Sequence, residues 1–96
     1  MSQFSTKRIG SVLENVIDDL GAREKIDEAR VIEVWAHLAG RPVNRVTESA
    51  WMKNNVLHLK IRSSAWRQEL RMGCEQWRER LNEELGEALV HEIRLH

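Results

Sequence analysis

The chain has 96 residues, of which 42% are hydrophobic and 31% charged, and its formal net charge at pH 7 is zero. This length gives room for one domain, residues 1–96, with a single modest core. The composition is typical of a soluble globular protein. No apolar run approaches the roughly 18 residues of a membrane span. A net charge of zero argues against strong nonspecific nucleic-acid binding.

A first amphipathic helix is predicted from about Ile9 to Leu20, because apolar residues recur there at helical spacing. Ser5 or Thr6 is a suitable N-cap, and Gly21 is a natural stop. The apolar stripe consists of Ile9, Val12, Leu13, Val16, Ile17 and Leu20.

A second helix is predicted over residues 22–39, with a break near Glu28 where the periodicity weakens. Gly40 followed by Pro42 ends it, since glycine supplies a left-handed cap and proline cannot continue the hydrogen-bond ladder. Its apolar stripe consists of Ile26, Val31, Val34, Trp35 and Leu38.

Two strands joined by Asn54-Asn55 are predicted next, because asparagine tolerates the positive φ of a tight hairpin turn. The resulting pairs are Met52–Leu57, Trp51–His58, Ala50–Leu59, Ser49–Lys60 and Thr47–Arg62. Paired residues share a face of the sheet. The predicted core face consists of Val46, Ala50, Met52, Leu57, Leu59 and Ile61. The opposite face is polar and cationic with one large aromatic, and consists of Thr47, Ser49, Trp51, Lys53, His58, Lys60 and Arg62.

A long third helix is predicted from the cap at Ser63 or Ser64 to about Leu85, with Gly86 as its stop. A short strand over residues 90–95 follows, with Ile93 and Leu95 pointing inward. A right-handed crossover places this strand parallel to one hairpin strand. The predicted fold is therefore α+β, in the order α-α-β-β-α-β, with a three-stranded mixed sheet covered on one face by helices.

No set of residues with catalytic or metal-binding spacing stands out. The four histidines, at positions 37, 58, 91 and 96, are scattered, and the chain lacks a glycine-rich phosphate loop. Cys74 lies beside the Trp77 stripe, which favours a small buried residue over a nucleophile. We therefore expect no enzyme activity, cofactor or metal. A single cysteine and the absence of a secretory signal pattern also favour a reducing, cytoplasmic setting.

The four tryptophans fall into two groups. Trp35, Trp66 and Trp77 lie on helical apolar stripes and are predicted to be core residues. Trp51 has His58, Ser49 and Lys60 as its predicted neighbours. An aromatic residue beside cations on an open sheet face suits stacking on a nucleic-acid base or anchoring a partner's side chain. Capping of the sheet edge, or folding under a loop, is an equally good interpretation of Trp51.

Positive charge is concentrated in residues 41–80, where nine cations and four anions give a net +5. Arg67 and Arg71 lie one turn apart near the start of the third helix and, with Arg62, suit one or two phosphates. Ordinary ion pairing, such as Arg71 with Glu75, is the alternative. The predicted nucleic-acid or partner-binding residues are Arg41, Arg45, Trp51, Lys53, His58, Lys60, Arg62, Arg67 and Arg71.

An ordered set of residues spanning about Ile9 to Leu95 resembles the DciA family of bacterial proteins, loaders or operators of the replicative helicase. The most specific part is Ala65-Trp66-Arg67-Gln68-Glu69-Leu70, directly after the predicted strand. The other matching positions are Trp35, Gly40, Thr47, Val56, Leu57, Ser64, Leu81, Asn82, Ile93 and Arg94.

The resemblance implies a fold similar to the K-homology domain, binding to the replicative helicase and weakly to single-stranded DNA, and no ATPase activity. Two departures from the pattern matter. A further basic tail found in many members has no counterpart before His96, and the Gly-x-x-Gly clamp of K-homology domains is absent from the sequence. An RNA- or ribosome-associated K-homology-like module is the alternative function, and a purely structural protein-interaction domain is a third.

Overall fold

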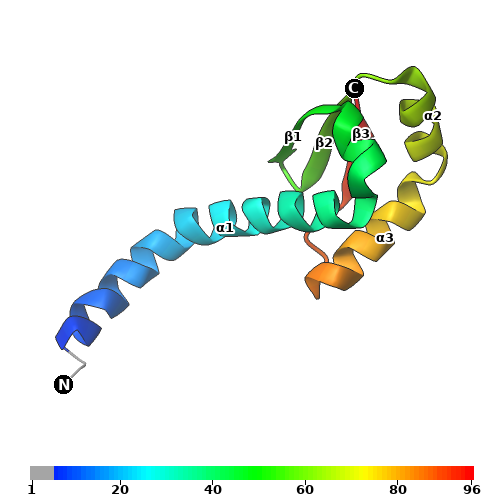
Figure 1. The fold of residues 1–96 in the computed structure, drawn as a ribbon. Coiled ribbons are helices and arrows are strands. Elements are labelled where there is room, and N and C mark those ends of the chain that lie inside the picture. Colours follow the sequence, from blue (N-terminus) through cyan, green and yellow to red (C-terminus); the bar gives the residue numbers. More distant parts are fainter. Residues whose placement is uncertain (1–5) are drawn as a thin grey trace.

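The computed structural model describes the backbone of residues 6–96 and the side chains of residues 21–96. Figure 1 shows the elements, which are α1 (Thr6–Val46), β1 (Thr47–Lys53), β2 (Val56–Ile61), α2 (Ser64–Met72), α3 (Cys74–Leu85) and β3 (Glu92–Leu95). The predicted α+β class and three-stranded mixed sheet are confirmed. In the described part of the chain, no helix combines the length and apolarity that crossing a bilayer requires.

The sheet has the strand order β1-β2-β3, with β1 antiparallel and β3 parallel to the central β2. The hairpin turn forms at Asn54 and Asn55, whose φ values of 52° and 64° are those of a tight turn with two left-handed residues. Four predicted hairpin pairs are confirmed, from Met52–Leu57 to Ser49–Lys60. The turn and the alternating pattern therefore fixed the register of the hairpin.

The far end of the hairpin differs from the prediction. Thr47 pairs with Ile61 rather than Arg62, because the register shifts between Thr47 and Ser49. Val46, predicted as a strand residue, ends α1 instead, and its carbonyl accepts a hydrogen bond of 2.7 Å from the Arg62 amide. The shift turns Thr47 away from the polar face, and its hydroxyl donates to the Val43 carbonyl at 2.7 Å.

The predicted stops at Gly21 and near Glu28 are wrong, because α1 runs through both positions. A glycine inside a helix costs only about 1 kcal/mol, which the rest of a long helix can offset. Residues 21–26 are exposed, and Figure 1 shows this part of α1 extending away from the sheet. The side chains of the predicted stripe Ile9–Leu20 lie outside the described residues.

The first helical region breaks at Gly40, as predicted, where φ is 85° and ψ is 176°. Such positive φ favours glycine over any residue with a side chain. A short helical segment, residues 41–46, then leads into β1. Pro42 is tolerated there because the first turn of a helix does not use its amide hydrogens within the helix.

The predicted third helix is two helices, since Gly73 separates α2 from α3 with φ −103° and ψ 19°. The bend lets α2 contact β2 and β3 while α3 contacts α1. The predicted ends of this region are confirmed. The Ser63 hydroxyl caps α2 by accepting from the Trp66 amide at 3.2 Å, and Gly86 ends α3 with φ 78°.

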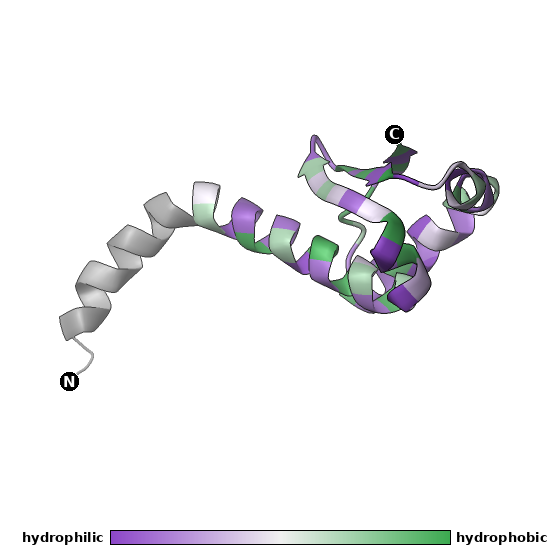
Figure 2. Ribbon diagram, turned by 45° about the horizontal axis from the view of Figure 1, so that its top comes forward, coloured by the Kyte–Doolittle hydropathy of each residue, from purple (hydrophilic) through white to green (hydrophobic). Residues whose placement is uncertain are grey.

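The core lies between one face of the sheet and the helices α1 and α3, and Figure 2 shows these helices gathered on that side. Trp35 is buried and meets Trp77 edge to face, with ring centroids 5.2 Å apart. Trp66 and Trp77 are half-buried and pack against the core. The buried core residues are Val31, Trp35, Val43, Leu57, Leu59, Ile61, Leu70, Leu81, Leu85, Val90 and Ile93.

Candidate nucleic-acid and partner interface

The sheet face that turns away from the helices carries polar and cationic side chains from all three strands. Strand alternation places Leu57, Leu59 and Ile61 in the core and His58 and Lys60 on the opposite side. We call this side the open face and define it by Ser49, Trp51, Lys53, His58, Lys60, Arg94 and His96. Trp51 and Lys60 therefore share a face, as the predicted docking surface requires.

Three aromatic rings lie together on the open face, and we call them the ring cluster: Trp51, His58 and His96. The Trp51 ring is nearly parallel to both imidazoles, with centroid distances of 5.1 Å to His58 and 5.5 Å to His96. His58 Nδ1 and His96 Nε2 are 2.9 Å apart, within hydrogen-bond distance. Their centroids are 5.2 Å apart and their planes differ by 17°, so the imidazoles meet edge to edge beside the indole.

The environment of His58 disfavours its charged form. Partial desolvation is the largest cause that lowers its pKa from the usual imidazole value, followed by the nearby His96 and Arg94. Glu92 acts in the opposite direction, and Lys53 adds to the lowering.

Sequence reasoning missed His96 and Arg94 as members of this face. The predicted last strand ended at residue 95 with Ile93 and Leu95 inward, so its own alternation places residues 94 and 96 outward. In the structure Arg94 pairs with His58 across the strands. The His96 amide donates to the Leu59 carbonyl at 2.8 Å, so the ladder continues past β3.

Three of the predicted arginines belong to the segments where α1 enters β1 and β2 leaves for α2, and we call Arg45, Arg62 and Arg67 the junction arginines. The Arg62 guanidinium donates to the Arg45 carbonyl, and the Arg67 guanidinium donates to the Ile61 carbonyl. These bonds hold both guanidinium groups close to the backbone. Each retains further N–H donors for an anion.

Three other predicted cations, Lys53, Arg41 and Arg71, are not among the junction arginines. Lys53 is at the turn end of the hairpin, roughly 20 Å along the strands from Arg62. Arg41 is exposed just after Gly40, and Arg71 is exposed in the last turn of α2. The suggested ion pair of Arg71 with Glu75 is not observed, because Glu75 binds Arg78 at 2.6 Å. The nine predicted residues therefore do not form one compact site.

Two open-face cations have acidic neighbours. Lys60 Nζ lies 3.4 Å from Glu48, and Arg94 lies 3.0 Å from Glu92. All four side chains are about half exposed, and such pairs contribute little to stability. The pairs also moderate the positive potential of the face, which favours weak rather than tight anion binding.

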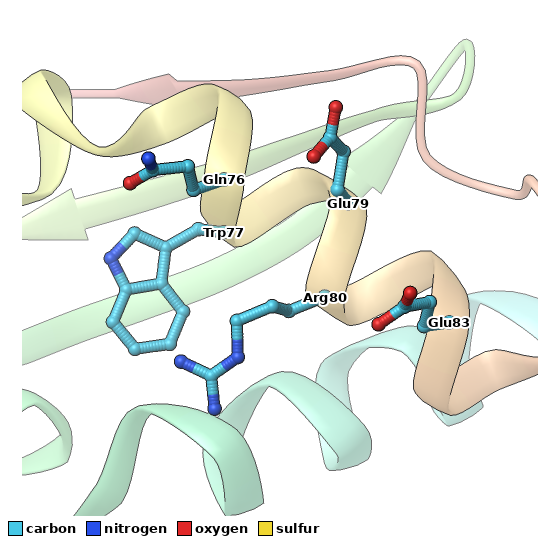
Figure 3. A pocket seen from close by; sticks show the side chains of 5 residues that line it. All are labelled: Gln76, Trp77, Glu79, Arg80 and Glu83. Atoms are coloured by element: carbon cyan, nitrogen blue, oxygen red, sulfur yellow. The ribbon is translucent and has the colours of Figure 1, made fainter.

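A shallow pocket of about 490 Å³ lies elsewhere, lined by Gln76, Trp77, Glu79, Arg80 and Glu83 of α3. Figure 3 shows the Trp77 indole and the Arg80 guanidinium side by side, both projecting toward α1. The guanidinium carbon lies 5.0 Å from the centroid of the Trp77 ring, a cation–π contact. The two residues lie one turn apart on α3, so the contact stays within that helix. Sequence reasoning did not find it.

Cys74 has the surroundings of a structural residue. It is half-buried, and its thiol donates to the Ile93 carbonyl with an Sγ–O distance of 3.2 Å. Burial and the carboxylates of Glu75 and Glu92 raise the pKa of the thiol. Among the described residues, no three His, Cys, Asp or Glu side chains converge as metal ligands would.

A family model described as "Dna[CI] antecedent, DciA" matches residues 8–95. The match covers all three strands and all nine predicted binding residues. No curated protein and no solved structure matches the chain.

Proposed function

The chain belongs to the DciA family, and from this premise we propose that it is a non-enzymatic replication adaptor. It binds the replicative helicase in the bacterial cytoplasm and assists helicase loading on DNA, with weak nucleic-acid binding of its own. The family is one of replication adaptors associated with the replicative helicase, and it is not a known enzyme family.

The observation that best supports the nucleic-acid part is the open face itself. It combines Trp51, 38% exposed, with Lys60 on the neighbouring strand and Arg94 on the third. Aromatic rings and cations on one surface are the pairing that binds single-stranded nucleic acid with little sequence preference. The junction arginines extend the positive surface toward α2.

The helicase contact is best assigned to a separate surface. Residues 21–40 of α1 carry more anions than cations, and the part nearest the N-terminus is exposed. An adaptor needs one contact for DNA and another for the helicase, so a basic open face and the exposed part of α1, with its small excess of anions over residues 21–40, suit the two tasks. Mechanistically, the adaptor raises the local concentration of DNA beside the helicase and performs no chemistry.

Affinity for DNA should be low and sensitive to salt. Each neutralised phosphate contributes about −0.7 to the slope of log K against log salt for single strands. The few cations of the open face and the junction therefore predict a slope of about −2 to −4.

The test uses the whole chain in two assays. An affinity-tagged chain is incubated with purified replicative helicase, and labelled single-stranded DNA is titrated at two salt concentrations. Lys60→Gln with Arg94→Gln should weaken DNA binding several-fold. The matched control, Arg23→Gln with Lys25→Gln on exposed α1, removes the same charge and should not. Absence of helicase capture, together with absence of DNA retention at low salt, contradicts the proposal.

The same titration with structured RNA addresses the alternative function. A clear preference for structured RNA over single-stranded DNA, lost in Trp51→Ala, would favour an RNA- or ribosome-associated module instead.

A further inference from the structure

The Trp51 indole has one covered face and one free face. Its strand, β1, is at the edge of the sheet, and both imidazoles of the ring cluster lie on its β2 side. The other indole face therefore turns toward the open edge of the sheet, in agreement with its 38% exposure. A flat ring brought to this edge would continue the existing stack.

The stack is held in place before any ligand arrives. His58 and His96 share the Nδ1–Nε2 hydrogen bond, and His96 is fixed by two backbone bonds to β2. The His96 amide donates to the Leu59 carbonyl at 2.8 Å, and the His96 carbonyl accepts from the Ile61 amide at 3.0 Å. A ligand thus loses little affinity to ordering the site.

Cations surround the ring cluster on each strand. Lys53 is two residues from Trp51 on β1, Lys60 two residues from His58 on β2, and Arg94 opposite His58 on β3. The acidic groups at the face are Glu48 and Glu92, and each is paired with one of these cations. A polyanion carrying flat rings complements this surface better than an apolar peptide does.

We propose that the ring cluster is a stacking site for an unpaired nucleic-acid base, and that its two imidazoles take up a proton when the strand binds. The inference rests on the proposed nucleic-acid contact of the open face and specifies its ligand and regulation. The base stacks on the free face of Trp51, and its phosphates lie near Lys53, Lys60 and Arg94.

Proton uptake follows from the imidazole pair. An N–H···N bond needs one unprotonated nitrogen, so the joined rings hold at most one positive charge between these two atoms. In the free protein, Lys53, Lys60 and Arg94 oppose that charge, while Glu48 and Glu92 favour it. Bound phosphates add negative charge, which opposes the lowering of the His58 pKa and favours a proton on the joined rings. Binding should therefore tighten as pH falls from 8 to 6.

The first arm of the test compares an oligo-dT strand with an abasic strand of equal length, which has the phosphates but no bases. The protein should bind oligo-dT about five-fold or more tightly, as one stacked base allows. Trp51→Ala should abolish the difference, and Trp51→Phe should keep most of it. Ile26→Ala removes another exposed apolar side chain, 59% exposed on α1, and should change nothing.

The second arm measures affinity for oligo-dT at pH 8 and pH 6. Wild-type affinity should rise about two- to ten-fold, since one proton linked to binding gives at most ten-fold per pH unit. His58→Gln combined with His96→Gln should flatten this dependence. The two backbone bonds of residue 96 remain available in that variant.

The outcomes separate the two proposals. If the wild type binds neither strand at low salt, the nucleic-acid contact and this inference both fail. If it binds oligo-dT and abasic strands alike, or if Trp51→Ala leaves the difference intact, the stacking site alone is overturned. A pH dependence that persists in the double histidine variant overturns the proton uptake, and helicase capture stays an independent readout.

Discussion

The two faces of the sheet are built from the same strands but have opposite physical properties. Along β2, Leu57, Leu59 and Ile61 are almost completely buried, whereas Lys60 between them is exposed. A step of one residue therefore separates a position that stabilises the fold from one available for binding. Substitutions on the core face should change stability by several kcal/mol, whereas substitutions on the open face should chiefly change binding and alter stability only slightly.

The largest predicted difference between the two faces is at Leu59 and Lys60, which are neighbours in β2. Leu59→Ala should lower the free energy of unfolding by about 2–5 kcal/mol, because it removes a side chain with 0% exposure from the core. Lys60→Ala should change it by less than about 0.5 kcal/mol. Urea denaturation followed by circular dichroism measures both. Equal losses at the two positions would show that the faces are not distinct.

A smaller loss of stability is expected at Asn82, whose side chain binds the backbone of Val90 just before β3. The Asn82 amide donates to the Val90 carbonyl at 2.8 Å, and its oxygen accepts from the Val90 amide at 3.0 Å. Asn82→Ala should cost about 1–3 kcal/mol, because two partly buried backbone groups lose their partner.

The matched control for Asn82 is Asn44, which makes one exposed hydrogen bond to the Ala36 carbonyl. Asn44→Ala should cost less than about 1 kcal/mol. The same urea measurement applies. A loss at Asn44 equal to that at Asn82 would mean that the pairing with Val90 does not fix β3.

The smallest predicted effect concerns pH and the open face. The pKa of His58 is lowered in the folded protein, chiefly by desolvation, so the unfolded chain binds more protons near and below the usual imidazole value. Thermal stability should therefore fall slightly as pH drops from about 7.5 to 5.5. His58→Gln should reduce this fall, and His91→Gln outside the ring cluster should not. A steeper fall of thermal stability with decreasing pH in His58→Gln than in the wild type would contradict this prediction.

The hairpin shows what the sequence could predict. Two asparagines and a strict alternation determine the register near the turn, and helix caps such as Ser63 and Gly86 act through neighbouring atoms. Glycine inside a helical pattern is different. Gly21 continues a helix and Gly73 breaks one, because packing against other elements decides the outcome.

The candidate site also has contacts that the sequence could predict and contacts that it could not. The pairing of Trp51 with His58 follows from the hairpin register, so sequence alone could place these rings together. The contact of both with His96 depends on how β3 docks, 38 residues after His58. The carbonyl that binds the Arg62 guanidinium is likewise set by the junction of α1 and β1. The expected likeness to K-homology domains stays a prediction.

A ¹⁵N NMR titration with oligo-dT, followed through the indole N–H signals of the four tryptophans, tests whether the open face binds single strands through Trp51. Trp35, Trp66 and Trp77 pack in or against the core, and Trp51 alone lies on the open face. The signal missing in Trp51→Phe identifies that indole. We expect this signal to shift as the strand is added while the other three stay in place. A shift at Trp66 or Trp77 with Trp51 unmoved would contradict it.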